Sequence, residues 1–417
     1  MIFYFGLMNR MPWHIPAVLA VTTFIHYLDR NNIALILPEL ARAFGWNDRA
    51  IGQYGEWVLG AFYVSFGLMQ IFLSPYAEKW GLKRSLLASV AGFSVVTLLF
   101  YPLAHSFLAI VGLRLLLGAA ESVHMPTNSA IVSRYFAPSY RARANSIYVG
   151  GILAALMVGP WVIIPLAGSL GWRSTFLILG SAGLLVGVPL ILRFIPDDRQ
   201  AFGERRSSFR WGEAFKGYGA ARPVLFWLYV VAGAANAFCV FGMLNWLPTY
   251  LHRQQSIPFD ELSLPLFGVF LAGVVGLFGW AFMGDRKGQR ILLAAGGLFV
   301  AGACVWLTAY ISTPAGALAL LISGVFFQSA YNAQEFATLQ DMVASHRVGA
   351  ATGLYNGLTV LLGGVGGSFI PGAIIALTGD FQAGILSIAC GAWLVSLCLI
   401  TLWQLKKKSS AQSPFEG

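Results

Sequence analysis

Apolar residues occur along this chain in long, nearly continuous runs. A helix that crosses a membrane needs about 20 mainly apolar residues, and we place twelve such runs. They lie near 13–37, 54–76, 85–104, 107–129, 144–168, 173–195, 223–249, 262–284, 291–311, 315–337, 348–375 and 381–405. The pattern predicts an all-α membrane protein with twelve transmembrane helices.

A long polar segment, 196–222, follows the sixth run and divides the chain near its middle. We expect it to be a cytoplasmic linker between an N-terminal six-helix half, 1–195, and a C-terminal six-helix half, 223–405. The remaining residues, 406–417, then form a basic cytoplasmic tail.

An internal repeat supports two related halves. EKWGLKR (78–84) follows the second run and DRKGQR (285–290) follows the eighth, and both read acid–base–x–Gly–x–base. The two motifs begin 207 residues apart, and Gly118 and Gly324 are separated by 206. A duplicated set of membrane helices is an architecture of secondary transporters.

Composition excludes a soluble protein. The chain has 57% apolar and 11% charged residues, whereas soluble domains carry about 25% charged residues. Its four cysteines lie in apolar runs without a Cys-x-x-Cys pair, and they predict neither disulfides nor a metal site. The sequence GGVGGS (363–368) lacks the features of a phosphate-binding loop, and close helix packing explains it better. We expect no enzyme activity, catalytic residue, cofactor or metal.

The Lys and Arg residues are distributed unevenly between alternate loops. The ends and loops on one side hold 21 of them and those on the other side hold four. Cytoplasmic loops are the ones enriched in Lys and Arg, so we expect both termini in the cytoplasm. The net charge of +10 therefore reports membrane topology, and nucleic acid is not an expected partner.

Charged residues within the apolar runs are the strongest functional signal. His26, Asp29 and Arg30 lie in the first run, and Arg114 and Glu121 lie in the fourth. Each charge near the centre of a membrane helix costs about 2.5–3.5 kcal/mol. Asp29 and Arg114 are both about 10–12 Å from the outer ends of their runs at 1.5 Å per residue. We therefore expect an Asp29–Arg114 ion pair, with a purely structural role as open as substrate contact.

Arg30 follows Asp29 directly and therefore points about 100° away on the helix, toward another neighbour or the central cavity. An arginine can bind a substrate carboxylate with two parallel hydrogen bonds. Asp29 and Glu121 lie at different depths with arginines nearby, so they can exchange protons while an anion occupies an arginine. His26 and His124 could relay protons, but packing histidines are the simpler interpretation of both.

The other polar residues within the runs are neutral. Those we assign to hydrogen bonds with a polar substrate are Tyr27, Tyr63, Asn236, Gln328, Asn332 and Asn356. Hydrogen bonds between neighbouring helices are at least as good an explanation for each amide.

The loop motifs resemble the cytoplasmic signature of the major facilitator superfamily. Within it, five stretches resemble the anion:cation symporter family, which includes bacterial sugar-acid transporters and the sialin and vesicular glutamate carriers. They are YLDRNNIAL (27–35), RLLLGAAE (114–121), RARANSIYVGG (141–151), GWRSTF (171–176) and NWLPTYL (245–251). The resemblance implies two pseudo-symmetric six-helix halves, with Asp29 and Glu121 carrying protons and Arg30 holding the anion.

The sequence departs from the family pattern in places. Glu78 and Lys79 replace the usual Asp-Arg of the first loop, and the seventh run, 223–249, lacks the arginine of the glutamate carriers. The latter counts against a dicarboxylate substrate. We expect the two cytoplasmic loops to form a gate that does not bind substrate, through Glu78, Lys79, Gly81, Asp285, Arg286 and Gly288.

These features together predict a monomeric, proton-coupled symporter of a small organic anion that works by alternating access. We place it in the lipid bilayer of a bacterial inner membrane. A proton-driven exporter of amphipathic compounds and a non-transporting membrane receptor on the same fold are the alternatives.

Overall fold

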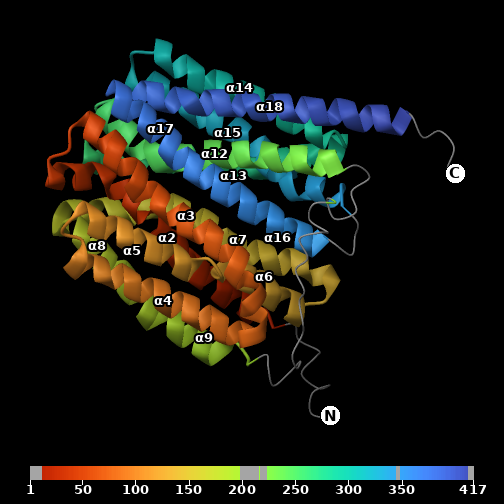
Figure 1. The fold of residues 1–417 in the computed structure, drawn as a ribbon, viewed down its shortest axis with the longest axis horizontal. Coiled ribbons are helices and arrows are strands. Elements are labelled where there is room, and N and C mark those ends of the chain that lie inside the picture. Colours follow the sequence, from red (N-terminus) through yellow and green to blue (C-terminus); the bar gives the residue numbers. More distant parts are fainter. Residues whose placement is uncertain (1–11, 198–215, 217–222, 344–347, 412–417) are drawn as a thin grey trace.

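A computed structural model describes residues 12–197, 216, 223–343 and 348–411. Across these residues the chain is helical and contains no strand, as the apolar runs predict. The helices lie roughly side by side, and the first and second parts of the chain form two adjacent groups (Figure 1). The red-to-yellow helices of the N-terminal half lie below the green-to-blue helices of the C-terminal half in that view.

The N-terminal half contains α2 (His14–Phe44), α3 (Asp48–Trp80), α4 (Leu82–Leu103), α5 (Phe107–Glu121), α6 (His124–Tyr135), α7 (Pro138–Leu170), α8 (Trp172–Ala182), the π-helix η1 (Gly183–Gly187) and α9 (Val188–Phe194). The C-terminal half contains α12 (Pro223–Arg253), η3 (Phe259–Glu261), α13 (Ser263–Lys287), α14 (Arg290–Leu307), η4 (Thr308–Tyr310), α15 (Pro314–Gln340), α16 (Val348–Thr359), the π-helix η6 (Val360–Gly364), α17 (Val365–Thr378) and α18 (Phe381–Ala411). We call the end of the bundle where α2 begins and α18 ends the terminal end, and the opposite end the far end.

Eleven helical segments of the described chain are long and apolar enough to cross a membrane. The first predicted span, α2, is not among them, because the polar run from His26 to Asn32 lowers its hydropathy. With 31 residues, however, α2 is as long as the others, and it packs most extensively against α7 inside the bundle. Composition thus supports eleven of the twelve predicted spans, and α2 is the polar exception.

Three predicted spans are interrupted rather than continuous. The fourth is broken between Glu121 and His124. Pro126 explains this break, since a proline ring clashes with the carbonyl four residues earlier, here that of Ser122. The sixth and eleventh spans each contain a π-helical turn, η1 and η6. Such interruptions in membrane helices commonly lie at functional positions.

The two halves meet most closely along α3 and α17, where glycines bring the backbones together. A Cβ atom at Gly52 would lie 2.3 Å from the backbone nitrogen of Ala376, and one at Gly60 would lie 2.2 Å from the Phe369 ring. A Cβ at Gly364, the last residue of η6, would lie 2.4 Å from the Tyr63 ring. The GGVGGS stretch therefore serves close helix packing, as predicted.

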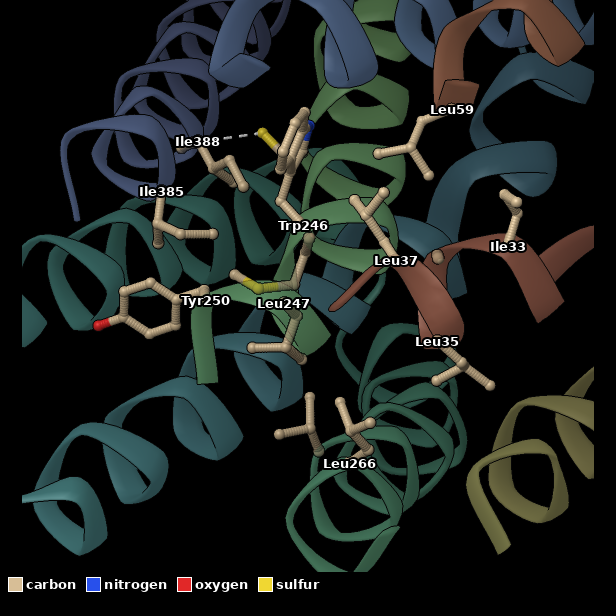
Figure 2. Packing of buried hydrophobic residues seen from close by; sticks show 14 of the residues in the cluster. Ile33, Leu35, Leu37, Leu59, Trp246, Leu247, Tyr250, Leu266, Ile385 and Ile388 are labelled. Atoms are coloured by element: carbon tan, nitrogen blue, oxygen red, sulfur yellow. Dashed lines mark hydrogen bonds between the residues drawn. The ribbon is translucent and has the colours of Figure 1, made fainter. Parts of the chain in front are cut away.

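A large apolar cluster continues across this boundary near the far end (Figure 2). Trp246 of α12 is fully buried, and its ring faces Leu37 of α2 and Leu59 of α3 in the other half. Its indole nitrogen donates a hydrogen bond to the backbone oxygen of Ser368, at 3.0 Å. Because this ring fills the space between the halves, the far end of the bundle is closed there.

Polar contacts also join the halves at the far end. Arg253 at the end of α12 lies 3.7 Å from Asp48 at the start of α3. The Ser263 hydroxyl at the start of α13 donates a hydrogen bond to the backbone oxygen of Pro160 in α7, at 3.0 Å. The exposed ion pair contributes little energy by itself, but both contacts place the sealed side at the far end.

The repeated loop motifs have a clear backbone role. Gly81 and Gly288 have φ angles of 96° and 65°, which favour glycine because a Cβ atom is strained there. The last basic residue of each motif then contacts its own half: Lys83 donates to Leu192 O at 2.9 Å, and Arg290 lies 3.2 Å from Asp341. Of the other predicted gate residues, Arg286 is exposed, and the side chains of Glu78, Lys79 and Asp285 lie outside the described residues.

The predicted domain boundaries are described only in part. Most of the predicted linker, 196–222, lies outside the described residues. The last helix continues to Ala411, six residues beyond the predicted boundary at 405. Lys406 and Lys407 lie in this extension, where their positive charges complement the negative end of the helix dipole. The apolar run therefore predicted the membrane-crossing part of this helix rather than its full length.

The close contact of α3 and α17 predicts a strong effect of one added methyl group. Gly52→Ala should lower the thermal unfolding midpoint of the detergent-purified protein, because its Cβ meets backbone rather than a flexible side chain. Gly279→Ala is the matched control, since nothing lies within 4 Å of a Cβ there. Equal midpoints for the two variants would contradict the packing described.

Candidate functional site

Six ionisable side chains are buried inside the N-terminal half, and we call them the charge cluster. They come from α2, α5 and α6 and have exposed fractions of 0–3%: His26, Asp29, Arg30, Arg114, Glu121 and His124. All the candidates predicted from the first and fourth runs therefore lie in the protein interior. Buried charges need partners or a function, because their desolvation is costly.

The expected Asp29–Arg114 ion pair is not formed, and this prediction is wrong. Thr97 of α4 donates a hydrogen bond to Asp29 Oδ2, and Oδ1 has no hydrogen-bond partner among the described residues. Arg114 instead donates through Nε to the backbone oxygen of Val58, at 2.9 Å. The position of a residue along its own helix does not reveal which partners other helices supply. Here α3 and α4 supply partners that compete with the expected ion pair.

Arg30 lies within a group of rings that we call the aromatic cage. Its Cζ atom is 4.8–5.4 Å from the ring centroids of Tyr27, Phe62, Tyr63, Phe66 and Phe241. Rings at such distances attract a cation through their faces. Four rings come from α2 and α3, and Phe241 comes from α12, so the Arg30 side chain reaches the boundary between the halves.

One edge of the Arg30 guanidinium is unused. Its Nε and Nη2 atoms are buried and have no hydrogen-bond partner in the described part of the chain. These two nitrogens form the edge through which arginine binds carboxylates with two parallel hydrogen bonds. Unpaired buried donors are costly, and the aromatic cage also keeps water away. The arrangement therefore leaves Arg30 prepared for an anion.

Arg114 differs from Arg30 in this respect. Its Nε atom is already bonded to Val58 O, which leaves only Nη1 as a buried nitrogen without a partner in the described residues. Its Cζ lies 4.7 Å from the Phe62 ring, which also contacts Arg30. Phe62 thus contacts both arginines. The structural interpretation of Arg114, left open by the sequence, gains support.

Glu121 contacts His26 rather than an arginine. His26 Nε2 lies 2.9 Å from Glu121 Oε2, although the approach is too bent for a hydrogen bond. The His26 ring also stacks on His124, with centroids 4.6 Å apart and planes inclined by 20°. The break between α5 and α6 places Glu121 and His124 on either side of a short turn. Sequence reasoning did not foresee this arrangement.

Three predicted amides of the C-terminal half come together, and we call them the amide group. Asn236 donates to Asn332 Oδ1 and accepts from Gln328 Nε2, each at 3.0 Å. Gln328 and Asn332 line a cavity of about 180 Å³ between α7, α12, α13 and α15. Asn356 is half-buried and does not bond to the other three amides. The amide group thus has both the interhelical role and the access to a cavity that were considered from sequence.

A hydrogen-bonded chain connects the aromatic cage with the C-terminal half. The Tyr63 hydroxyl donates to Asn245 Oδ1 at 3.3 Å, and Asn245 Nδ2 donates to Ser368 Oγ at 2.9 Å. Tyr63 belongs to α3, Asn245 to α12 and Ser368 to α17. The predicted candidate Tyr63 therefore contacts Arg30 and also bridges the two halves.

A second buried polar group in the C-terminal half was missed from sequence. The Tyr355 hydroxyl donates to Glu335 Oε1, and Tyr331 and Tyr355 share a hydrogen bond, both at 2.8 Å. The Tyr229 hydroxyl donates to the backbone oxygen of Glu335 at 2.7 Å. These tyrosines come from three different helices, and their spacing in the chain carries no common signal.

No group of three or more His, Cys, Asp or Glu side chains in the described residues is arranged to hold a metal ion. This includes His26, Glu121 and His124.

The comparison with protein families decides the identity. Residues 19–368 match the model of the Major Facilitator Superfamily. The chain belongs to this superfamily. It is a multi-pass membrane transporter rather than an enzyme, and the resemblance found in its loop motifs is confirmed.

Curated relatives cover most of the chain and transport organic acids. The chain is 23% identical over 394 residues to the hexuronate transporter of Bacillus subtilis, covering 90% of this chain and 91% of that protein. It is 28% identical to the probable sulfoacetate transporter SauU of Cupriavidus necator, with 88% and 87% covered. It is 24% identical to a D-galactonate transporter of Escherichia coli, with 92% and 93% covered.

Solved structures share the fold at low sequence identity. A bacterial homolog of the human lysosomal transporter Spinster, in an inward-facing and occupied conformation, matches with a TM-score of 0.79 and 17% identity. That match covers 94% of this chain and 96% of the other. The nucleoside transporter NupG matches with a TM-score of 0.72 and 15% identity, covering 93% and 99%. The predicted all-α fold of a membrane transporter is therefore confirmed.

The contact of Thr97 with Asp29 predicts a pair of contrasting variants. Thr97→Val should lower the free energy of unfolding by about 1–3 kcal/mol, because a buried carboxylate loses its hydrogen-bond donor. Thr97→Ser keeps the hydroxyl and should cost much less. The measurement is the thermal unfolding midpoint of each purified transporter in one detergent, and equal losses would contradict the role of the hydroxyl.

Proposed function

We propose that this transporter moves a small organic anion together with protons across the bacterial inner membrane, most simply by import. The observation that carries the proposal is the unused edge of Arg30, a buried cation with two unpaired donors on one side. A carboxylate or sulfonate group presents two oxygens that match this edge. Binding would neutralise the guanidinium and satisfy both nitrogens at once.

A single available arginine favours a substrate with one acidic group. Arg114 is bonded to Val58 O, and the predicted spans of the C-terminal half contain no arginine near their centres. Gln328 and Asn332 of the amide group line a cavity at the boundary of the halves and can hydrogen-bond hydroxyl groups. Hexuronate and galactonate, the substrates in the names of two relatives, each carry one acidic group, and sulfoacetate carries a carboxylate and a sulfonate, each of which matches the Arg30 edge.

Proton coupling is assigned to Glu121 and Asp29. Glu121 is fully buried, and its Oε2 atom lies 2.9 Å from His26 Nε2, a group that can exchange a proton with it. The surroundings of Asp29 can accommodate both its charged and its protonated form. Thr97 Oγ1 contacts both Asp29 Oδ2 and the backbone oxygen of Phe93. The hydroxyl donates to Asp29 when the carboxylate is charged, and it can accept from Asp29 and donate to Phe93 when it is protonated.

Alternating access follows from the way the halves meet. Trp246, Gly52 and the Ser263–Pro160 bond close the far end. The excess of Lys and Arg on the side of the termini favours the terminal end as the cytoplasmic one. In this orientation the far end is periplasmic and closed. Rocking of the halves about Arg30 and the Tyr63–Asn245 bond would open it.

The anion role of Arg30 predicts a loss of uptake that depends on the shape of the cation. Arg30→Ala should abolish uptake of D-glucuronate, D-galactonate and sulfoacetate into proteoliposomes with an inward proton gradient. Arg30→Lys keeps the charge without the two-donor edge and should retain at most a few per cent of the wild-type rate.

The matched control is Arg42→Ala, which removes an exposed arginine of the same helix, α2. Undiminished anion uptake by Arg30→Ala would overturn the assignment. Export of amphipathic cations or neutral compounds by that variant would support the exporter alternative, and binding without flux would support a receptor.

If Glu121 couples transport to protons, its replacement should reduce net transport much more than exchange. Glu121→Gln should lose proton-driven accumulation of the same acids by at least tenfold, because the amide cannot take up and release a proton. Counterflow of labelled against unlabelled substrate needs no net proton movement and should fall much less. Accumulation at the wild-type level in Glu121→Gln would refute its coupling role.

A further inference from the structure

Six buried polar atoms without hydrogen-bond partners lie together beside Glu121. They are both ring nitrogens of His26, both ring nitrogens of His124 and both carboxylate oxygens of Glu121, all within the described residues. Buried polar groups in proteins are nearly always hydrogen-bonded. The exceptions mark strain, a functional role, or a place for a water or an ion. Six such atoms in one place are therefore not explained by helix packing alone.

The geometry suits proton transfer. His26 Nε2 and Glu121 Oε2 are 2.9 Å apart, within the range over which a general acid and base exchange a proton. In an apo transporter such a contact can be bent and become straight later in the cycle. His124 holds the ring in place by stacking on its other side, and Phe93 of α4 lies 5.7 Å from the His26 ring.

The surrounding charges limit how long His26 can hold a proton. The titratable or charged groups around it are Glu121 of α5, His124 of α6, Tyr27, Asp29 and Arg30 of α2, and Tyr63 of α3, which contacts Arg30. Arg30 is one helical turn away from His26, and two stacked imidazolium ions would repel each other. The two stacked histidine rings therefore hold at most one added proton at a time, and only briefly.

The position of the histidines gives the transfer a direction. Along α2, His26 precedes Arg30, and along α5 and α6, His124 follows Glu121, so both histidines lie toward the terminal end. Farther in that direction Asn128 donates to Thr23 Oγ1 at 3.1 Å, and both side chains are buried. The Thr23–Asn128 pair thus places further buried polar groups between the histidines and the side that the proposed function makes cytoplasmic.

We propose that His26 is the proton-transfer partner of Glu121 and carries its proton toward the terminal end, with His124 as the positioning residue. This inference rests on the proposed function. In the step, the O–H bond of protonated Glu121 breaks, its electron pair stays on the carboxylate, and an N–H bond forms at His26 Nε2. The proton then leaves toward the Thr23–Asn128 side, which restores neutral His26.

The test compares His26→Gln with the wild type in proteoliposomes, with D-glucuronate as the first probe and D-galactonate and sulfoacetate as the others. Glutamine keeps a polar group near Glu121 but cannot titrate. We expect accumulation driven by a proton gradient to fall at least tenfold, while counterflow falls less than threefold. The pH profile of net uptake should also lose the wild-type dependence on internal pH.

His105→Gln is the matched control, because His105 is exposed at the far end, and it should behave as the wild type. A purely structural role for His26 would reduce accumulation and counterflow equally, which would overturn the proposal. If His26→Gln does not fold, His124→Asn is measured instead; the same split supports the proposal and equal losses overturn it.

The two proposals fail in different ways. Wild-type accumulation by Glu121→Gln would refute the proposed coupling itself. Lost accumulation in Glu121→Gln together with wild-type accumulation and pH profile in His26→Gln would refute only the role of His26.

Discussion

The candidate site depends on one buried cation. The Arg30 guanidinium is a permanent charge inside a membrane protein, and one of its edges has no hydrogen-bond partner among the described residues. No carboxylate within the described residues pairs with it, and five aromatic rings supply part of the lost solvation. Each such contact is worth about 2 kcal/mol or more when it is desolvated. The rings cover the faces of the cation and leave its donor edge to be satisfied by an anion.

The rest of the architecture places this cation where substrate binding can affect both halves. Phe241 of the C-terminal half completes the aromatic cage, and Tyr63 bonds to Asn245 across the boundary. The charge cluster belongs entirely to the N-terminal half, whereas the C-terminal half contributes neutral amides beside a cavity. Under the proposed function this asymmetry separates the two tasks: one half binds the charged group and the protons, and the other recognises the neutral part of the substrate.

Much of this could be predicted from the sequence, because apolar runs and buried charges are strong signals in a membrane protein. The spans followed from the apolar runs, and the buried positions of Arg30 and Glu121 followed from their places within those runs. The hydrogen-bond partners of each charged side chain could not be predicted in this way. Thr97 and Val58 replaced the expected Asp29–Arg114 pair, because depth along two helices says nothing about what a third helix offers. His26 and His124 meet only because the chain breaks after Glu121, an effect of Pro126 that no periodicity reveals.

The most direct test of the account is to record the internal pH of proteoliposomes while substrate enters without an imposed proton gradient. With D-glucuronate, D-galactonate or sulfoacetate outside and a membrane permeable to K⁺, the account predicts that the interior acidifies in step with labelled substrate. The acidification should be absent with Arg30→Ala. Entry of an organic anion through the wild-type protein without proton movement would contradict the account.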